Sequence, residues 1–257
     1  MKEAEDQSQG RKLLTAVERI LSDTDSLIAL AEQHLRKARE DKREASEEVV
    51  RYFSTRAAIS GGLAAAPALI PGAGTLVAAL GGALADMGFL LKYEVEMALV
   101  LSYLHGFDIR KDEERQLAFL LASVSTYDAK SGENALVDMA KAEGVAIWKY
   151  APREVSKHLV SVMTKIALLQ LSKGLVRALP LVGIAVGSSM NKVLTKRVGE
   201  RCIRDLQTRR EFLSTESARK EQEEEVVEAR VRPPAKKKSA AKKSAKAPAR
   251  RAAGRKS

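Results

Sequence analysis

Several features that define common protein classes are scarce in this chain of 257 residues. Its single cysteine, Cys202, excludes an internal disulfide and any metal site built from several cysteines. Aromatic residues make up only 4% of the chain, and most of the apolar residues are Ala, Leu and Val. That composition favours helices over a β-sandwich or a β-barrel. No segment alternates polar and apolar residues between turn signals, so the sequence predicts an all-α fold.

The first residues lack the apolar core of a signal peptide. Residues 1–10 are polar and are predicted to be disordered, and a helical domain is predicted for residues 11–230. A lone cysteine suits a reducing compartment. We therefore expect a cytoplasmic protein that associates with a membrane for the reasons given below.

Acidic residues are missing from the end of the chain. Residues 229–257 hold 12 Lys or Arg and no Asp or Glu, whereas the other 228 residues have a net charge of −1. A disordered polycation is predicted for residues 231–257. It would bind phosphates of nucleic acid or anionic lipid without sequence preference, because it has no aromatic side chain to stack on bases. A solubilising segment without a dedicated partner is the alternative. The expected anion-binding residues are Lys236, Lys237, Lys238, Lys242, Lys243, Lys246, Arg250 and Arg251.

Charge is also absent from residues 57–85, which include 11 Ala and 6 Gly. The length would permit a transmembrane helix, but Pro71, Gly72 and Gly74 interrupt the segment. The half before Pro71 would be about 21 Å long as a helix, shorter than the ~30 Å hydrocarbon core of a bilayer. The sequence therefore predicts a helical hairpin that does not span a membrane.

Local signals delimit the other predicted helices. Residues 22–25 favour a helix cap and a break, and Gly106 is a plausible left-handed cap after a helix that ends near residue 104. Asp112 is expected to start the next helix, and Pro152 suits the first turn of a helix that runs to about residue 172. A long helix is expected from about residue 181 to 230.

Two series of small residues recur at a spacing of four. The first is Gly74, Ala78, Gly82 and Asp86, and the second is Gly183, Gly187, Asn191, Thr195 and Gly199. Small residues on one helix face allow two backbones to approach closely. We expect the two faces to pack together, so that Asp86 faces Asn191 or Thr195, or the adjacent Lys192 or Arg197. Coincidence in an Ala- and Gly-rich chain is the alternative.

Asp86 is the strongest candidate for a special role, since a carboxylate among apolar neighbours is costly unless it is paired. Three interpretations stay open: a buried polar contact that aligns the two Gly-rich helices, a functional carboxylate in a cleft or membrane, or simple exposure.

Other motifs carry no recognisable chemistry. The turn of Pro71, Gly72 and Gly74 lacks the Lys-Ser/Thr and the preceding strand of a phosphate-binding loop. The three histidines lie on separate elements without Cys or carboxylate at ligand spacing, and no Ser/His/Asp arrangement is visible. We expect no metal, no cofactor and no catalytic residue that can be named.

Two separated blocks of the sequence resemble the EcsC family. The first comprises Tyr52, residues 57–62, the turn at residues 69–72, Ala85 with Asp86, and residues 105–108. The second comprises residues 179–183, Gly187, Asn191 and residues 195–199 with Ile203. The family pattern often places an arginine directly after the threonine, whereas here Lys196 separates Thr195 from Arg197.

The family takes its name from a gene beside an ABC transporter and has no established chemical activity. The resemblance implies a bacterial, helical protein that associates with a membrane surface or a membrane protein such as an ABC transporter. Three functions follow as hypotheses: a non-enzymatic membrane-associated or transporter-accessory protein, a soluble scaffold tethered to nucleic acid by its basic tail, and an enzyme with a site near Asp86.

Overall fold

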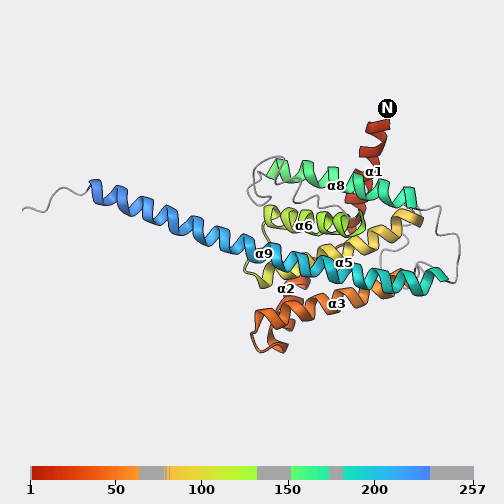
Figure 1. Cartoon of the computed structure of the whole chain (residues 1–257), viewed down its shortest axis with the longest axis horizontal. Coiled ribbons are helices and arrows are strands. Elements are labelled where there is room, and N and C mark those ends of the chain that lie inside the picture. Colours follow the sequence, from red (N-terminus) through yellow and green to blue (C-terminus); the bar gives the residue numbers. More distant parts are fainter. Residues whose placement is uncertain are drawn as a thin grey trace, which may run out of the picture. The chain divides into compact units, whose positions relative to one another are not determined.

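The structure is a computed structural model that describes residues 2–63, 78, 80, 82–131, 152–173 and 182–231. These residues form seven helices and no strand, which confirms the predicted all-α class. The helices are α1 (Lys2–Ile20), α2 (Thr24–Lys37), α3 (Lys42–Leu63), α5 (Gly82–Leu104), α6 (Asp112–Ser131), α8 (Pro152–Lys173) and α9 (Val182–Val231) (Figure 1).

The break between α1 and α2 is set by Asp23, as the capping residues at 22–25 predicted. The Asp23 carboxylate accepts hydrogen bonds from the backbone N–H of Ser26 at 2.9 Å and from its hydroxyl at 2.7 Å. At the other end, α1 already begins at Lys2, within the segment for which composition predicts disorder. Packing explains the difference: a Cβ on Gly10 would collide with Thr164 of α8, so the two helices touch at backbone distance.

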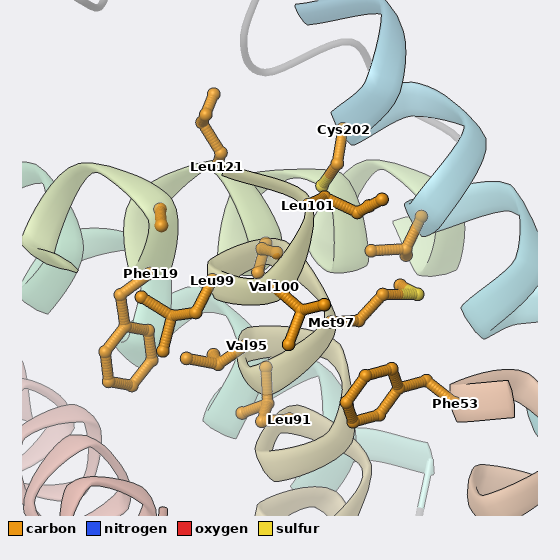
Figure 2. Close-up of a cluster of buried hydrophobic side chains, with 14 of the residues drawn as sticks. Phe53, Leu91, Val95, Met97, Leu99, Val100, Leu101, Phe119, Leu121 and Cys202 are labelled. Carbon is orange, nitrogen blue, oxygen red and sulfur yellow. The ribbon is translucent and has the colours of Figure 1, made fainter. Parts of the chain in front are cut away.

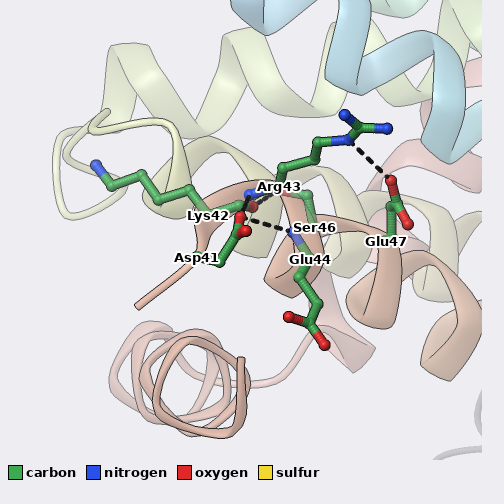
Figure 3. A network of polar contacts seen from close by, with 6 residues as sticks. All are labelled: Asp41, Lys42, Arg43, Glu44, Ser46 and Glu47. Carbon is green, nitrogen blue, oxygen red and sulfur yellow. Dashed lines mark hydrogen bonds and ion pairs between the residues drawn. The ribbon is translucent and has the colours of Figure 1, made fainter. Parts of the chain in front are cut away.

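A second acidic cap starts α3 (Figure 3). The Asp41 carboxylate accepts from the backbone N–H groups of Arg43 at 2.8 Å and Glu44 at 3.1 Å. One turn into the helix, Arg43 Nε lies 3.3 Å from Glu47 Oε1 in an exposed ion pair. The cap satisfies N–H groups that have no partner within the helix itself.

The core is built around α5, which contacts α1, α2, α3, α6 and α8. Leu91, Met97 and Leu101 of α5 are fully buried, and Phe53 of α3 and Leu121 of α6 pack into the same cluster (Figure 2). α5 ends at a left-handed glycine, Gly106, with φ +92°. Because α5 is surrounded, any charged side chain along its middle must find its partner inside the protein.

The chain divides into two compact units, residues 1–213 and 214–257. The described part of the second unit is the polar end of α9, where Arg219 lies 3.7 Å from Glu223 and Lys220 lies 3.9 Å from Glu216. The predicted tail lies outside the described residues beyond Val231, as do its eight candidate anion-binding side chains.

Candidate functional site

A buried carboxylate joins three helices at the centre of the first unit. Glu94 of α5 is 0% exposed. Its Oε2 lies 2.5 Å from the Thr126 hydroxyl of α6, and its Oε1 lies 3.1 Å from the Thr195 hydroxyl of α9. Both threonines are themselves fully buried. The three side chains therefore form a closed polar contact between α5, α6 and α9.

The proton inventory of this contact favours a neutral Glu94. The Thr126 hydroxyl has one proton but two acceptors in range, since the carbonyl oxygen of Ala122 also lies 2.8 Å away. A protonated Glu94 resolves the conflict by donating to Thr126, which then donates to Ala122. Burial raises the pKa of Glu94 to about 7, opposed by the Thr126 hydrogen bond, the charge of Lys130 and the Thr195 hydrogen bond.

About two turns further along α9, an ion pair and a thiol extend the polar core. Arg201 lies 2.8 Å from the buried carboxylate of Asp128 on α6. Asp205 lies 3.9 Å from the same arginine, and burial raises the pKa of its carboxyl. Cys202 is fully buried between them, and burial raises the pKa of its thiol to about 12 (Figure 2). An un-ionised thiol is a poor nucleophile, so Cys202 acts as a packing residue.

This arrangement fixes helices rather than offering groups to a solute. Glu94, Thr126 and Thr195 are closed to solvent, and each is held by a protein partner. Among the described residues, no group of three or more His, Cys, Asp or Glu side chains is placed to hold a metal ion. The chemistry available at Glu94 is the uptake or loss of one proton.

The structure places the polar residues predicted from sequence on α5 and α9. Thr195 meets an acidic residue of α5, and that residue is Glu94, two turns beyond Asp86. Asp86 and Asn191 are half-buried, whereas Lys192 and Arg197 are exposed. Sequence reasoning passed over Glu94, although it continues the spacing of four through Asp86 and Leu90.

The structure describes some of the predicted close-packing glycines and not others. Gly199 lies in tight contact, since a Cβ there would be 2.6 Å from Val50 Cγ2 and 2.9 Å from Met97 Sδ. Gly82 begins α5, and Gly183 and Gly187 lie in the first turns of α9. The turn residues Pro71, Gly72 and Gly74 lie outside the described residues.

A second feature is the surface at one end of the first unit, here called the Gly-rich end. It comprises residues 51–63 of α3, 165–173 of α8 and 182–199 of α9 (Figure 1). Most of the exposed large apolar side chains in the described residues lie here. They are Ile59, Leu168, Leu171, Met190 and Val193, and Leu213 is the one elsewhere.

The Gly-rich end also carries charge of one sign. Its three stretches contain seven Lys or Arg and no Asp or Glu. Arg56 stacks 4.4 Å from the ring centre of Tyr52, and Lys165 lies 5.6 Å from that of Tyr127, so two cations lie over aromatic rings. Three acids adjoin these stretches: Asp86 of α5 is half-buried, Glu200 lies 3.7 Å from Lys196, and Glu48 lies 3.5 Å from Arg51.

None of the described helices combines the length and apolar content that crossing a bilayer would need. The model of the EcsC protein family matches residues 6–210 of the chain, which covers both the Glu94 contact and the Gly-rich end. No curated protein and no solved structure matches this chain.

Proposed function

Because this chain belongs to the EcsC protein family, whose match covers residues 6–210, we propose that its first unit is a non-enzymatic membrane-surface protein. It docks on anionic lipid with the Gly-rich end. The observation that carries the proposal is the coincidence at that end of exposed apolar side chains with an acid-free set of cations.

The apolar side chains supply the first component of binding. Met190 is 61% exposed, Val193 is 50% exposed, and Ile59 on α3 is 57% exposed. Burying one such side chain in an apolar medium contributes about 1.5–3 kcal/mol. Several of them on the ends of three helices give a surface suited to shallow insertion at the headgroup boundary.

The cations supply the second component. Exposed Lys192, Lys196 and Arg197 follow directly after Met190 along α9, and long basic side chains can extend their charge to lipid phosphates while their methylenes stay against apolar surface. Each Lys or Arg near an anionic membrane contributes about 1 kcal/mol. Lys196 and Arg51 are paired with Glu200 and Glu48 just outside these stretches, so the attraction rests on the remaining five cations.

A peripheral role also fits the chemistry of the polar core. Glu94 with its threonine partners and Arg201 with Asp128 join helices to one another inside the protein. Such groups stabilise a fold and present no reactive atom to a substrate. This favours a binding role over the alternative of an enzyme site near Asp86.

Vesicle flotation tests the proposal. The full chain is mixed with phosphatidylcholine vesicles that do or do not contain phosphatidylglycerol. We expect flotation with the anionic vesicles only, and at least about a tenfold loss of bound protein for Met190→Glu with Val193→Glu. Leu213→Glu is the matched control, because Leu213 is an exposed apolar residue of α9 outside the Gly-rich end.

The basic tail forms a separate arm of the same experiment. A chain that ends at residue 230 should still float, since docking by the Gly-rich end does not require the polycation. Complete loss of binding in the truncated chain, with no effect of the Met190 and Val193 changes, would overturn the proposal. That result would instead favour a body tethered to phosphates by its tail.

A further inference from the structure

We propose that a cavity beside α1 binds the phosphate group of an anionic phospholipid. The inference deepens the proposed membrane docking, on which its lipid identity rests. The cavity has a volume of about 620 Å³. The described residues that line it all belong to α1, and it is open to solvent.

One wall of the cavity is a basic face of α1. Arg11, Lys12 and Arg19 line it, together with the hydroxyl-bearing Ser8 and Thr15. Residues three or four positions apart lie on the same side of a helix, so the three cations converge on one region. Guanidinium and ammonium groups, supplemented by hydroxyl donors, are the groups that bind phosphate.

Among the described residues, these cations have no acidic partner. None of them has an Asp or Glu three or four residues away within α1, and none forms an ion pair with another described residue. Glu18, the acid nearest along the chain, does not line the cavity and is influenced by Arg115 of α6. Elsewhere, Arg43, Arg201 and Arg209 are all within 4 Å of a carboxylate. The α1 wall thus carries uncompensated positive charge.

Apolar side chains adjoin this basic face of α1. Ala16 lines the cavity and also packs with Ala85 and Phe89 of α5 in a small apolar cluster. Leu80, near the start of α5, packs against the same cluster. Of this cluster only Ala16 lines the cavity, so a hydrocarbon chain that adjoins a phosphate would contact Ala16 and the methylene stems of the basic side chains, whereas a free phosphate would use only their charged ends. Since Leu80 adjoins the Ala/Gly-rich segment, the cavity lies beside the surface proposed to dock on lipid.

Calorimetric titration of the full chain tests the site with three soluble probes. These are dihexanoyl phosphatidic acid below its micelle concentration, dihexanoyl phosphatidylcholine and inorganic phosphate. We expect saturable binding of the phosphatidic acid only. Arg11→Gln with Lys12→Gln and Arg19→Gln should weaken it at least about tenfold, because charge-assisted contacts to the phosphate are removed.

The matched control removes three exposed cations at the connection between α2 and α3, with Lys37→Gln, Arg39→Gln and Lys42→Gln. It should bind the phosphatidic acid as the natural chain does. All six positions are exposed, so both variants should keep the helical circular dichroism and melting temperature of the natural chain.

The outcomes separate this inference from the proposed function. Flotation of the natural chain together with unweakened phosphatidic acid binding by the α1 variant would overturn the cavity and leave membrane docking intact. Equal binding of inorganic phosphate would overturn the lipid part of the inference, and equal binding of phosphatidylcholine would overturn selection by charge. Loss of flotation with retained, α1-dependent binding of phosphatidic acid would instead refute the docking surface alone.

Discussion

Arg209 and Lys192 lie on the same helix, but their surroundings differ in kind. Arg209 is buried, donates to both carboxylate oxygens of Glu114 at 2.6 and 2.7 Å, and lies 4.0 Å from the ring centre of Phe107. Lys192 is exposed between Met190 and Val193 in a stretch without acid. At one end of the first unit, cations hold helices together. At the Gly-rich end, Lys196 and Arg51 are paired in exposed contacts, whereas Lys192 has no carboxylate within 4 Å among the described residues and remains available to another molecule.

The largest difference should appear when each cation is removed. Arg209→Ala leaves Glu114 without its bidentate partner, and breaking a largely buried pair costs about 3–5 kcal/mol. Lys192→Ala should change the free energy of unfolding by less than about 0.5 kcal/mol, as exposed sites usually do. Urea unfolding of both variants measures the two changes in the free energy of unfolding. Equal midpoints would show that the Arg209 contact does not hold α9 to α6.

A pH titration of stability probes Glu94, where α5, α6 and α9 meet. The folded pKa of about 7 lies above the ordinary value of 4.5, so the folded state binds the proton more tightly than the unfolded chain. Stability should therefore fall as the pH rises from about 4.5 to about 7, by on the order of 3 kcal/mol, and then level off. Glu94→Gln should remove this part of the pH dependence.

Other groups contribute to the same curve, so the comparison with the variant is essential. Burial also raises the pKa values of Glu18 and Asp205, which act in the same direction. Burial lowers the pKa values of His34 and His105, whose neutral forms are favoured by folding and which act in the opposite direction as the pH falls. An unaltered difference in stability between pH 4.5 and 7 in Glu94→Gln would mean that Glu94 ionises freely.

A substitution at Gly199, where α9 packs closely against α3 and α5, should have an intermediate effect on stability. Gly199→Ala places a methyl group 2.6 Å from Val50 Cγ2 and 2.9 Å from Met97 Sδ. Overpacking of this kind costs about 1–3 kcal/mol, which exceeds the helix propensity gained. Ser189→Ala, at an exposed position of the same helix, is the control and should be neutral or stabilising. A higher melting temperature for Gly199→Ala would show that the helices can separate at no cost.

The smallest change in stability is expected at the start of α3, far from the Gly-rich end. Asp41→Ala removes the acceptor for two backbone N–H groups and should destabilise the protein by about 1 kcal/mol. Glu47→Ala breaks only the exposed ion pair with Arg43 and should cost about 0.3–0.5 kcal/mol. Identical unfolding midpoints for the two variants would contradict the capping role.

Helix boundaries could be predicted wherever the signal is local. Asp23, Gly106 and Pro152 each act on the backbone within a few residues, and the structure places a helix start or end at each of them. The helical start of α1 could not be predicted in this way. Its order comes from contact with α8 at Gly10, more than 150 residues away in the chain.

The polar core shows the same division between local and distant information. Periodicity identified the α5 face that carries Asp86 and the α9 face that carries Thr195. It could not select the acid that faces Thr195, because that depends on how far one helix slides along the other. Glu94 was further obscured by its neighbours, since Lys92 and Glu96 form an ion pair at 2.6 Å and make the segment look like a solvated one.

Burial of Cys202 has a practical consequence for spectroscopy. It is the only cysteine of the chain, and burial raises the pKa of its thiol to about 12, so almost none of it is thiolate at neutral pH. Maleimide and methanethiosulfonate reagents should therefore leave the native protein unmodified. A cysteine introduced at exposed Met190 or Ile59 would react alone, and its nitroxide or fluorophore would report the polarity and depth of the Gly-rich end without any substitution in the core.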